Sequence, residues 1–164
     1  MYKYIIAIGG ALLGVNSVAL GSECSAVADN LVKNCGFETG CFMDWAATTI
    51  NMGVEDAEVA HSGEYGVKLY PHDTVSWVGQ GLETTAGQSY TVSLWLQNLQ
   101  APNHLELWWD DELIFEASGL PESDYQQVVI DGVIAPSDST MFWIGMTNPN
   151  GYVYLDDVVV VPSR

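Results

Sequence analysis

Short segments in which apolar and polar side chains alternate recur along almost the whole chain, and this pattern restricts the fold more than any other feature. The clearest example is the segment 89–98, where Val92, Leu94 and Leu96 share one parity and mostly polar residues share the other. Successive side chains of a strand point to opposite faces, so this segment predicts a strand with one buried face. Beyond the N-terminal region, no stretch of the sequence combines sustained helical periodicity with helix caps.

Turn-forming residues separate these segments at short intervals, as at 136–139 (PSDS) and 148–151 (NPNG). Eight or nine short strands joined by such turns indicate an all-β chain. We therefore expect an antiparallel β-sandwich of the jelly-roll type. The predicted strands are 29–34, 65–70, 75–82, 89–98, 104–110, 113–116, 125–135, 140–147 and 151–162.

The last predicted strand carries two adjacent carboxylates, Asp156 and Asp157, among β-branched and aromatic residues. In a regular strand Val153, Leu155 and Asp157 share one face and Asp156 lies on the other, so one carboxylate points into the core. A buried ionised carboxylate is costly unless it is hydrogen-bonded, paired or bound to a metal. Because the chain has few cationic side chains, a calcium ion is the expected partner. The alternatives are an Asp that accepts bonds from the neighbouring backbone, and a bulge that turns both carboxylates to water.

The balance of charge excludes several classes of partner. The chain has 164 residues with 21 acidic and 4 basic side chains, so its formal net charge is −17. Nucleic acids and anionic membrane surfaces attract basic patches, so neither is an expected partner. Hydrophobic residues make up 48% of the chain, which suffices for a real core. Without an internal repeat or a low-complexity linker, residues 22–164 are expected to form a single domain.

Residues 1–21 have the pattern of a secretory signal peptide. Lys3 precedes an apolar, glycine-rich run, and Ala19-Leu20-Gly21 places small residues where signal peptidase cleaves. The run is shorter than the roughly 20 apolar residues that a membrane span needs. We expect a secreted, extracellular protein without membrane association after cleavage, and an uncleaved anchor is the alternative.

Export places the chain in an oxidising compartment, where cysteines form disulfides. Cys35 and Cys41 flank a short glycine-containing segment and are the first candidates for a bridge. Pairing of Cys24 with either of them stays open. A zinc site is not expected, because the three histidines lie far from the cysteines in the sequence.

Several tryptophans lie on the polar parity of the predicted strands, together with amides, hydroxyls and carboxylates. Indole rings stack on the apolar C–H faces of sugars, while polar groups bind the hydroxyls. This pattern indicates a glycan-binding face. The alternative is a second core, in which the indoles lie under a loop or between sheets. The expected ligand-binding residues are Trp95, Trp108, Trp143, Trp77, Gln97 and Glu106, whereas Trp45 and Trp109 are expected to pack in the core.

Catalysis is the competing use of the carboxylates. Glycosidases need two carboxyl groups about 5 to 9 Å apart, and Glu106 with Asp110 or Glu112 could form such a pair. A chain with 21 acidic residues produces such pairs by chance. The sequence has no Gly-x-Ser-x-Gly elbow, phosphate loop or dinucleotide-binding motif. We therefore expect a protein that is not an enzyme, and a small acid-pair glycosidase is the less favoured alternative.

Four short motifs extend across nearly all of the chain after residue 21: 30–40 (NLVKNCGFETG), 61–63 (HSG), 90–95 (YTVSLW) and 154–158 (YLDDV). Together they resemble the carbohydrate-binding modules of the family 4/9 type, which are galactose-binding-like β-jelly rolls. The resemblance implies a non-catalytic module that binds a polysaccharide in a groove on one sheet.

The same resemblance implies a structural calcium ion. Carried over by position, Glu38 and Asp157 would be its ligands, with backbone carbonyls near His61 and Gly63 as helpers. The groove would use Trp95 and Trp108.

The chain departs from the family pattern at Cys35 and Cys41, which replace residues that are usually small or polar. The fold is also shared by domains that bind proteins or form surfaces, so fold alone does not establish sugar binding. A secreted structural or protein-binding domain is therefore the main alternative to a secreted, calcium-stabilised glycan-binding protein.

Overall fold

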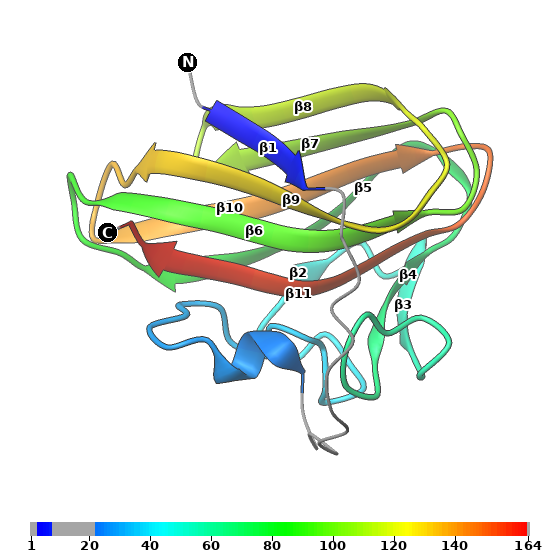
Figure 1. Ribbon diagram of the computed structural model, residues 1–164, viewed down its shortest axis with the longest axis horizontal. Helices are drawn as coiled ribbons and strands as arrows, with labels where there is room; N and C mark the ends of the chain where they lie inside the picture. The colour runs from blue at the N-terminus through cyan, green and yellow to red at the C-terminus, as the bar shows by residue number, and fades with distance from the viewer. Residues whose placement is uncertain (1–2, 8–21, 164) are drawn as a thin grey trace.

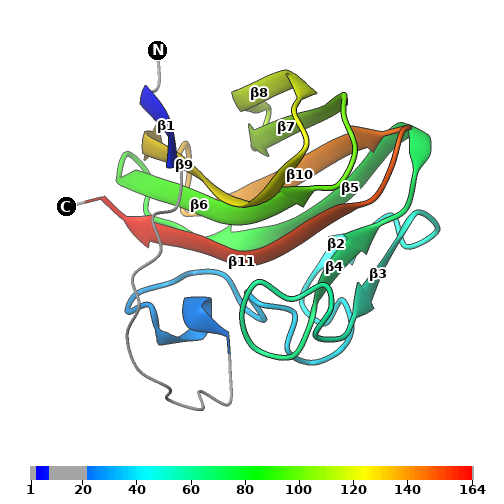
Figure 2. The ribbon, with the colours of Figure 1, turned by 45° about the vertical axis from the view of Figure 1, so that its right-hand side comes forward.

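Two antiparallel sheets form the molecule, and the computed structural model describes residues 3–7 and 22–163. One sheet has six strands in the order β1-β9-β6-β11-β4-β3, and the other has five in the order β2-β5-β10-β7-β8. Many neighbouring strands are far apart in the sequence, as Figure 1 shows for β6 beside β11. Figure 2 shows the two sheets as separate layers. The predicted all-β, jelly-roll sandwich is thus confirmed.

The strands after residue 65 agree with the sequence pattern, with shifts of a few residues at their ends. The six-stranded sheet consists of β1 (Lys3–Ala7), β9 (Ser123–Ile134), β6 (Ser89–Asn98), β11 (Val153–Pro162), β4 (Gly66–Leu69) and β3 (Met52–Glu55). The five-stranded sheet consists of β2 (Ala46–Ala47), β5 (His72–Glu83), β10 (Ser139–Asn148), β7 (Asn103–Trp109) and β8 (Glu112–Leu120). A short 3-10 turn, η1 (Glu23–Ala26), is the one helical element among the described residues.

The core lies between the sheets and uses the parity that the sequence predicts. Val92, Leu94 and Leu96 of β6 are buried, and the alternate residues of β7 and β10 face them from the other sheet. Trp109 and Trp45 are buried as predicted, and the Trp45 ring stacks on Phe37 with centroids 5.1 Å apart. Burial of apolar area at about 25 cal/mol per Å² makes this interior the main stabilising contribution.

A bulge in β11 changes the face on which its residues lie. Asp156 pairs with Trp95, but the next pair joins Val159 to Ser93, and Asp157 has a positive φ of 46°. Because of the extra residue, two residues separated by an odd number of positions, Leu155 before the bulge and Val158 after it, both face the core. Both carboxylates are buried, with Asp156 0% and Asp157 3% exposed. The expectation that one Asp faces inward in a regular strand is therefore wrong. The bulge given as an alternative is present, but it buries both carboxylates instead of turning them to water. Asp156 also accepts the N–H of the neighbouring Asp157 (2.7 Å), as the other alternative expected.

The predicted strand at 29–34 does not form. Asp29 and Asn34 have positive φ angles of 63° and 48°, which interrupt an extended chain. The segment still borders β11, because the Leu31 N–H donates to the Val160 carbonyl (2.9 Å) and the Val158 N–H donates to the Cys35 carbonyl (3.0 Å). In Figure 1 this part of the chain lies below β11. It covers the side of β11 opposite β6, beyond the end of the pairing of β11 with β4.

The N-terminal region is described only in part. Lys3–Ala7 forms β1 and pairs with β9, from Lys3 opposite Asp131 to Ala7 opposite Gln127. Residues 1–2 and 8–21, which complete the predicted signal peptide, lie outside the described residues. The signal peptide and the domain boundary at residue 22 stay predictions. Within the described part of the chain, no helix has the length and apolar character to cross a membrane.

The disulfide joins Cys24 to Cys35, and Cys41 is a free, exposed thiol. The predicted Cys35–Cys41 bridge is therefore wrong, and one of the pairings left open is correct. The reason is tertiary: η1 brings Cys24 against β11, where its N–H donates to Asp157 Oδ1 (3.2 Å). Cys35 is held against the same strand by its carbonyl.

We predict that replacing Cys24 and Cys35 together by Ser lowers the free energy of unfolding by about 3 kcal/mol, since the bridge closes a loop between residues 11 apart. Denaturant titration of the oxidised and double-mutant chains measures this. Cys41→Ser is the matched control and should leave stability within about 0.5 kcal/mol, because its side chain is exposed. Greater destabilisation by Cys41→Ser than by the double mutant would contradict the observed pairing.

Candidate functional site: a tryptophan cleft and an acidic centre

Three of the four predicted tryptophans meet on the outer face of the five-stranded sheet. Trp143 of β10 lies opposite Trp108 of β7 on one side and Gly79 of β5 on the other, and Trp77 of β5 lies opposite Gly145. All three indoles are partly exposed. They line a cleft of about 610 Å³ together with Ala46, Ala47, Thr48 and Asp110.

Two glycines provide the space for the rings. A Cβ atom at Gly79 would lie 2.2 Å from Cε3 of Trp143, and one at Gly145 would lie 2.5 Å from Cζ3 of Trp77. Each indole therefore lies across the backbone of the neighbouring strand. The rings of Trp77 and Trp143 are nearly perpendicular, at 81°, with centroids 6.5 Å apart. A flat ligand can thus meet indoles in two orientations.

The edge strand β2 forms a low wall beside these rings. Ala46 and Ala47 pair with Gly79 and Val78 of β5. Beyond β2, the Thr48 N–H donates to the Trp77 carbonyl (2.8 Å), and the Trp77 N–H donates to Thr48 Oγ1 (3.2 Å). Small side chains on this wall leave the tryptophans accessible. Sequence reasoning missed it, because 46–59 has no clear strand pattern.

Two carboxylates lie on either side of Trp108 along the chain: Glu106 on β7, and Asp110 in the turn that follows β7. The Trp108 Nε1–H donates to Glu106 Oε2 (2.7 Å), and the Met141 N–H donates to Asp110 Oδ1 (2.6 Å). Each carboxylate is thus fixed through one oxygen. Within the described residues, the other oxygen of each, Glu106 Oε1 and Asp110 Oδ2, has no hydrogen-bond partner.

The structure does not place Trp95 and Gln97 at this cleft. Both belong to β6 of the six-stranded sheet, where Gln97 lies opposite Tyr154 of β11. The Trp95 ring is covered by His61, with centroids 3.9 Å apart and an interplanar angle of 15°. The prediction that both share one face with Trp108 and Trp143 is wrong. Alternation separates inward from outward residues, but a sandwich has two outer faces.

A second cluster of functional side chains lies at the bulge of β11. Asp156 accepts the backbone N–H groups of His61 (2.8 Å), Ser62 (3.1 Å) and Asp157 (2.7 Å). Asp157 accepts the Ser62 hydroxyl (2.6 Å) and the Cys24 N–H (3.2 Å), and its Oδ2 lies 2.8 Å from His61 Nδ1. The buried carboxylates are thus satisfied by hydrogen-bond donors from two distant segments.

The two carboxyl groups of this centre differ in acidity. Burial raises the pKa of Asp156 to about 7, and the neighbouring charge of Asp157 acts in the same direction. Burial also acts to raise the pKa of Asp157, but the hydrogen bonds from His61 and Ser62 outweigh it and hold this pKa below its ordinary value. Asp157 therefore ionises at lower pH than Asp156.

Glu38, the other predicted calcium ligand, holds the same loop as Asp157. Its carboxylate accepts the N–H groups of Glu64 (3.1 Å) and Tyr65 (3.2 Å). Asp157 Oδ1 and Glu38 Oε2 each accept one hydrogen bond from the described residues, so each keeps a lone pair for a hard cation. The residues present are compatible with calcium in this respect.

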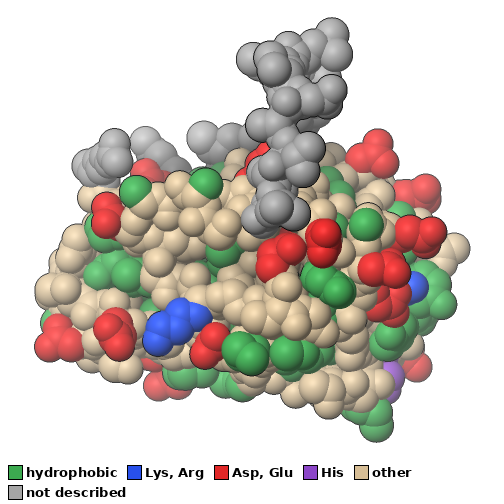
Figure 3. All heavy atoms as spheres, turned by 90° about the horizontal axis from the view of Figure 1, so that it is seen from below, with side chains coloured by type: hydrophobic (Ala, Val, Ile, Leu, Met, Phe, Trp, Pro, Cys, Tyr) green, Lys and Arg blue, Asp and Glu red, His purple; other side chains and the backbone are tan. Residues whose placement is uncertain are grey.

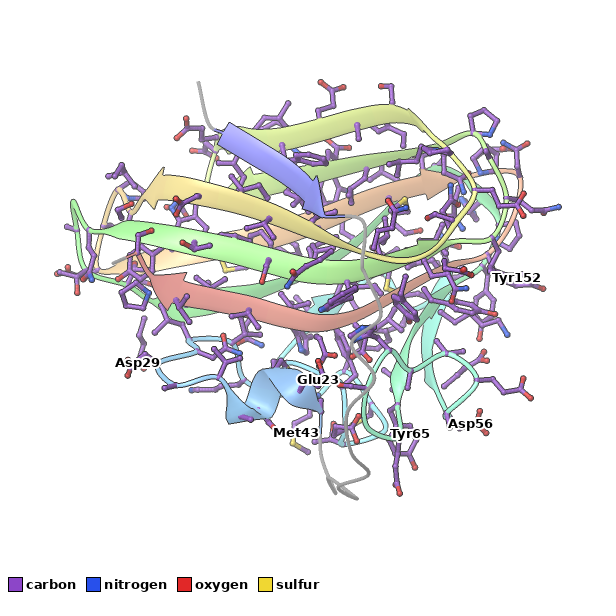
Figure 4. The ribbon with its side chains drawn as sticks, in the orientation of Figure 1. Glu23, Asp29, Met43, Asp56, Tyr65 and Tyr152 are labelled. Atoms are coloured by element: carbon purple, nitrogen blue, oxygen red, sulfur yellow. A yellow bond between two sulfur atoms is a disulfide. The ribbon has the colours of Figure 1, made fainter. Side chains whose placement is uncertain are left out.

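One further set of potential metal ligands was missed by sequence reasoning. Ligand atoms of Glu23, His61 and Asp157 lie within 4.8 Å of one another. Figure 4 shows Glu23 on η1, below β11. No sequence spacing could have revealed this set, because three separate segments contribute to it.

No protein family matches the sequence, and no curated protein matches it either. Solved structures do match the fold. TmCBM61 in complex with β-1,4-galactotriose is 23% identical with a TM-score of 0.68, over 82% of this chain and 99% of that chain. The C-terminal family 22 carbohydrate-binding module of Clostridium thermocellum Xyn10B is 14% identical with a TM-score of 0.60, over 83% and 96%.

A two-module structure from the same xylanase, CBM22-1 with GH10 in complex with xylohexaose, is 14% identical with a TM-score of 0.64. The match covers 84% of this chain and 29% of that chain. At these identities the similarity establishes a shared β-sandwich fold. The modules belong to families 61 and 22, so the 4/9 type stays a prediction.

Proposed function

We propose that this protein binds a polysaccharide or oligosaccharide, without cleaving it, in the cleft lined by Trp77, Trp108 and Trp143. One observation carries the proposal: three partly exposed indoles from three adjacent strands line one cleft of about 610 Å³. Tryptophans are usually buried, and an open group of three on a sheet is suited to ligand contact.

The chemistry of the cleft suits a sugar. Indole faces attract the C–H faces of pyranose rings, and carboxylate oxygens accept hydrogen bonds from hydroxyl groups. Glu106 and Asp110 are fixed before a ligand arrives, which lowers the entropic cost of binding. The similarity to modules solved with β-1,4-galactotriose and xylohexaose supports the same ligand class.

We predict that Trp143→Ala lowers glycan affinity by about 30-fold or more, since buried aromatic contacts at an interface often contribute about 2 kcal/mol. Affinity electrophoresis in gels containing β-1,4-galactan, xylan or hydroxyethylcellulose measures retention. The matched control is Trp95→Ala on the other sheet, which should lower thermal stability by removing the stack on His61 and leave retention unchanged. Retention lost in Trp95→Ala and kept in Trp143→Ala would refute the proposed cleft.

A glycosidase is not favoured by the environment of its candidate acids. Glu106 and Asp110 are partly exposed, and each accepts a hydrogen bond, from Trp108 and Met141 respectively, so neither occupies the enclosed, apolar position typical of a general acid. We predict that a retained polysaccharide gains no reducing ends during prolonged incubation. Release of reducing sugar that is abolished in Glu106→Gln would instead identify an enzyme.

We also propose that the protein is exported and that a structural calcium ion binds Glu38 and Asp157. The leader-like residues 1–21 and the Cys24–Cys35 disulfide support export. The two carboxylates hold one loop from both ends and have free lone pairs, which supports the calcium site. When bound, the ion would supply a charge that neutralises these carboxylates.

Removal of calcium is expected to lower the melting temperature, because an ion that binds only the folded chain stabilises it by about 2.7 kcal/mol at 100 times its dissociation constant. Scanning calorimetry before and after chelation tests this, with metal content checked by elemental analysis. Glu38→Gln should abolish the response to calcium, and Glu64→Gln, an exposed neighbour, should not. The same melting temperature after verified removal would exclude the site.

A further inference from the structure

We propose that the tryptophan cleft selects its ligand by charge: it binds uncharged, hydroxyl-rich saccharide chains and rejects chains that carry carboxylate or sulfate groups. Glu106 and Asp110 are the specificity-determining residues. This inference rests on the proposed function, and it names the class of glycan that the cleft takes.

The first step concerns the row of side chains along β7. Alternate residues of a strand lie about 7 Å apart on the same face, which places Glu106 beside Trp108, and Asp110 lies in the turn directly after β7 with a positive φ of 48°. The Glu106 side chain lies over Gly145, where a Cβ atom would come within 2.8 Å of Glu106 Cγ. Asp110 lines the cleft itself. A sugar that covers Trp108 must therefore approach at least one of these two groups.

The second step concerns what the carboxylates can do. Glu106 Oε2 accepts the Trp108 indole N–H and Asp110 Oδ1 accepts the Met141 N–H, so neither side chain turns away without losing that bond. The remaining oxygens, Oε1 and Oδ2, can only accept hydrogen bonds when ionised. A sugar hydroxyl satisfies them by donating. A carboxylate or sulfate of the ligand has no hydrogen to donate and is repelled.

The third step concerns cations. The residues that line the cleft include no Lys, Arg or His. Lys68 lies on the other sheet, where its Nζ is 3.0 Å from Glu55 Oε2. His104 precedes Glu106 by two residues on β7, but its ring contacts Ser118 (3.0 Å) and Glu116 (3.7 Å) of β8. The backbone of Lys33 is joined to the Gln80 side chain of β5 by two hydrogen bonds (2.8 and 3.0 Å), but Lys33 is not among the residues that line the cleft. None of the described residues that line the cleft therefore carries a positive charge that could form an ion pair with an anionic ligand.

The overall negative charge of the protein also repels anionic ligands, but this repulsion is not confined to the cleft. The formal net charge is −17, and Figure 3 shows acidic side chains spread over one face with few basic ones. This distant repulsion is screened beyond about 8 Å at physiological salt. Asp110 lines the cleft and Glu106 is bonded to the indole of Trp108, which also lines it, so the effect of these two carboxylates should persist at higher salt.

The experiment compares neutral and anionic polysaccharides with matched backbones. The probes are hydroxyethylcellulose against carboxymethylcellulose, methyl-esterified against de-esterified homogalacturonan, and β-1,4-galactan against the same galactan oxidised at its primary hydroxyls. Affinity electrophoresis in 0.15 and 0.5 M NaCl gives the dissociation constant for each. We expect the neutral member of any retained pair to bind at least about tenfold more tightly at both salt concentrations.

The variants Glu106→Gln and Asp110→Asn remove charge and keep an oxygen that accepts the existing N–H bonds. Each should reduce the neutral-to-anionic ratio by about threefold or more. The matched control is Asp56→Asn, which changes the net charge equally on an exposed loop after β3 (Figure 4) and should leave the ratio unchanged.

The outcomes separate this inference from the proposed function. Equal or tighter binding of the anionic member, with loss in Trp143→Ala, overturns charge selection and leaves the cleft as the binding site. A ratio that shifts equally in Asp56→Asn assigns selection to net charge and overturns the role of Glu106 and Asp110. If the folded protein retains none of the six polymers, the proposed function fails for these glycans, and the inference fails with it.

Discussion

The β-bulge at Asp156 and Asp157 is the constraint on which the rest of the six-stranded sheet depends. The bulge adds one extra residue to β11, and both carboxylates are buried there. Each of them makes three hydrogen bonds. The donors are Cys24, His61, Ser62 and the Asp157 backbone. A buried carboxylate without donors would be strongly destabilising, so the bulge and the two segments that supply the donors, at Cys24 and at His61–Ser62, stabilise one another.

This centre also explains why the two outer faces of the sandwich differ. Asp156 fixes the backbone of His61, and the His61 ring covers Trp95 of β6 and meets Tyr125 of β9 edge-on, with centroids 5.1 Å apart. The cleft on the five-stranded sheet is bordered by Ala46 and Ala47 of β2, whose side chains are small. One aromatic face is therefore covered by a loop, and the other is left open for a ligand.

The open face is built from small residues as much as from large ones. Gly79 and Gly145 allow the Trp143 and Trp77 rings to lie on the sheet, and Trp108 is oriented by its bond to Glu106. The inner face of the same strands packs into the core, so the indoles rest on a rigid support. Binding groups that are fixed in advance favour affinity, and fixed carboxylates favour discrimination between ligands.

The sequence alone determined the fold class, most strands and the division into buried and exposed residues, because side-chain alternation is a local property of each strand. It also singled out the acidic pair in β11 and the tryptophans outside the core. Only the tertiary structure decided which sheet each tryptophan joins, since Trp95 and Trp108 have the same local pattern and differ in their strand partners. The Cys24–Cys35 bridge, the burial of both Asp156 and Asp157 and the pairing of Trp143 with Gly79 depend on contacts between residues far apart in the chain, which a local pattern does not encode.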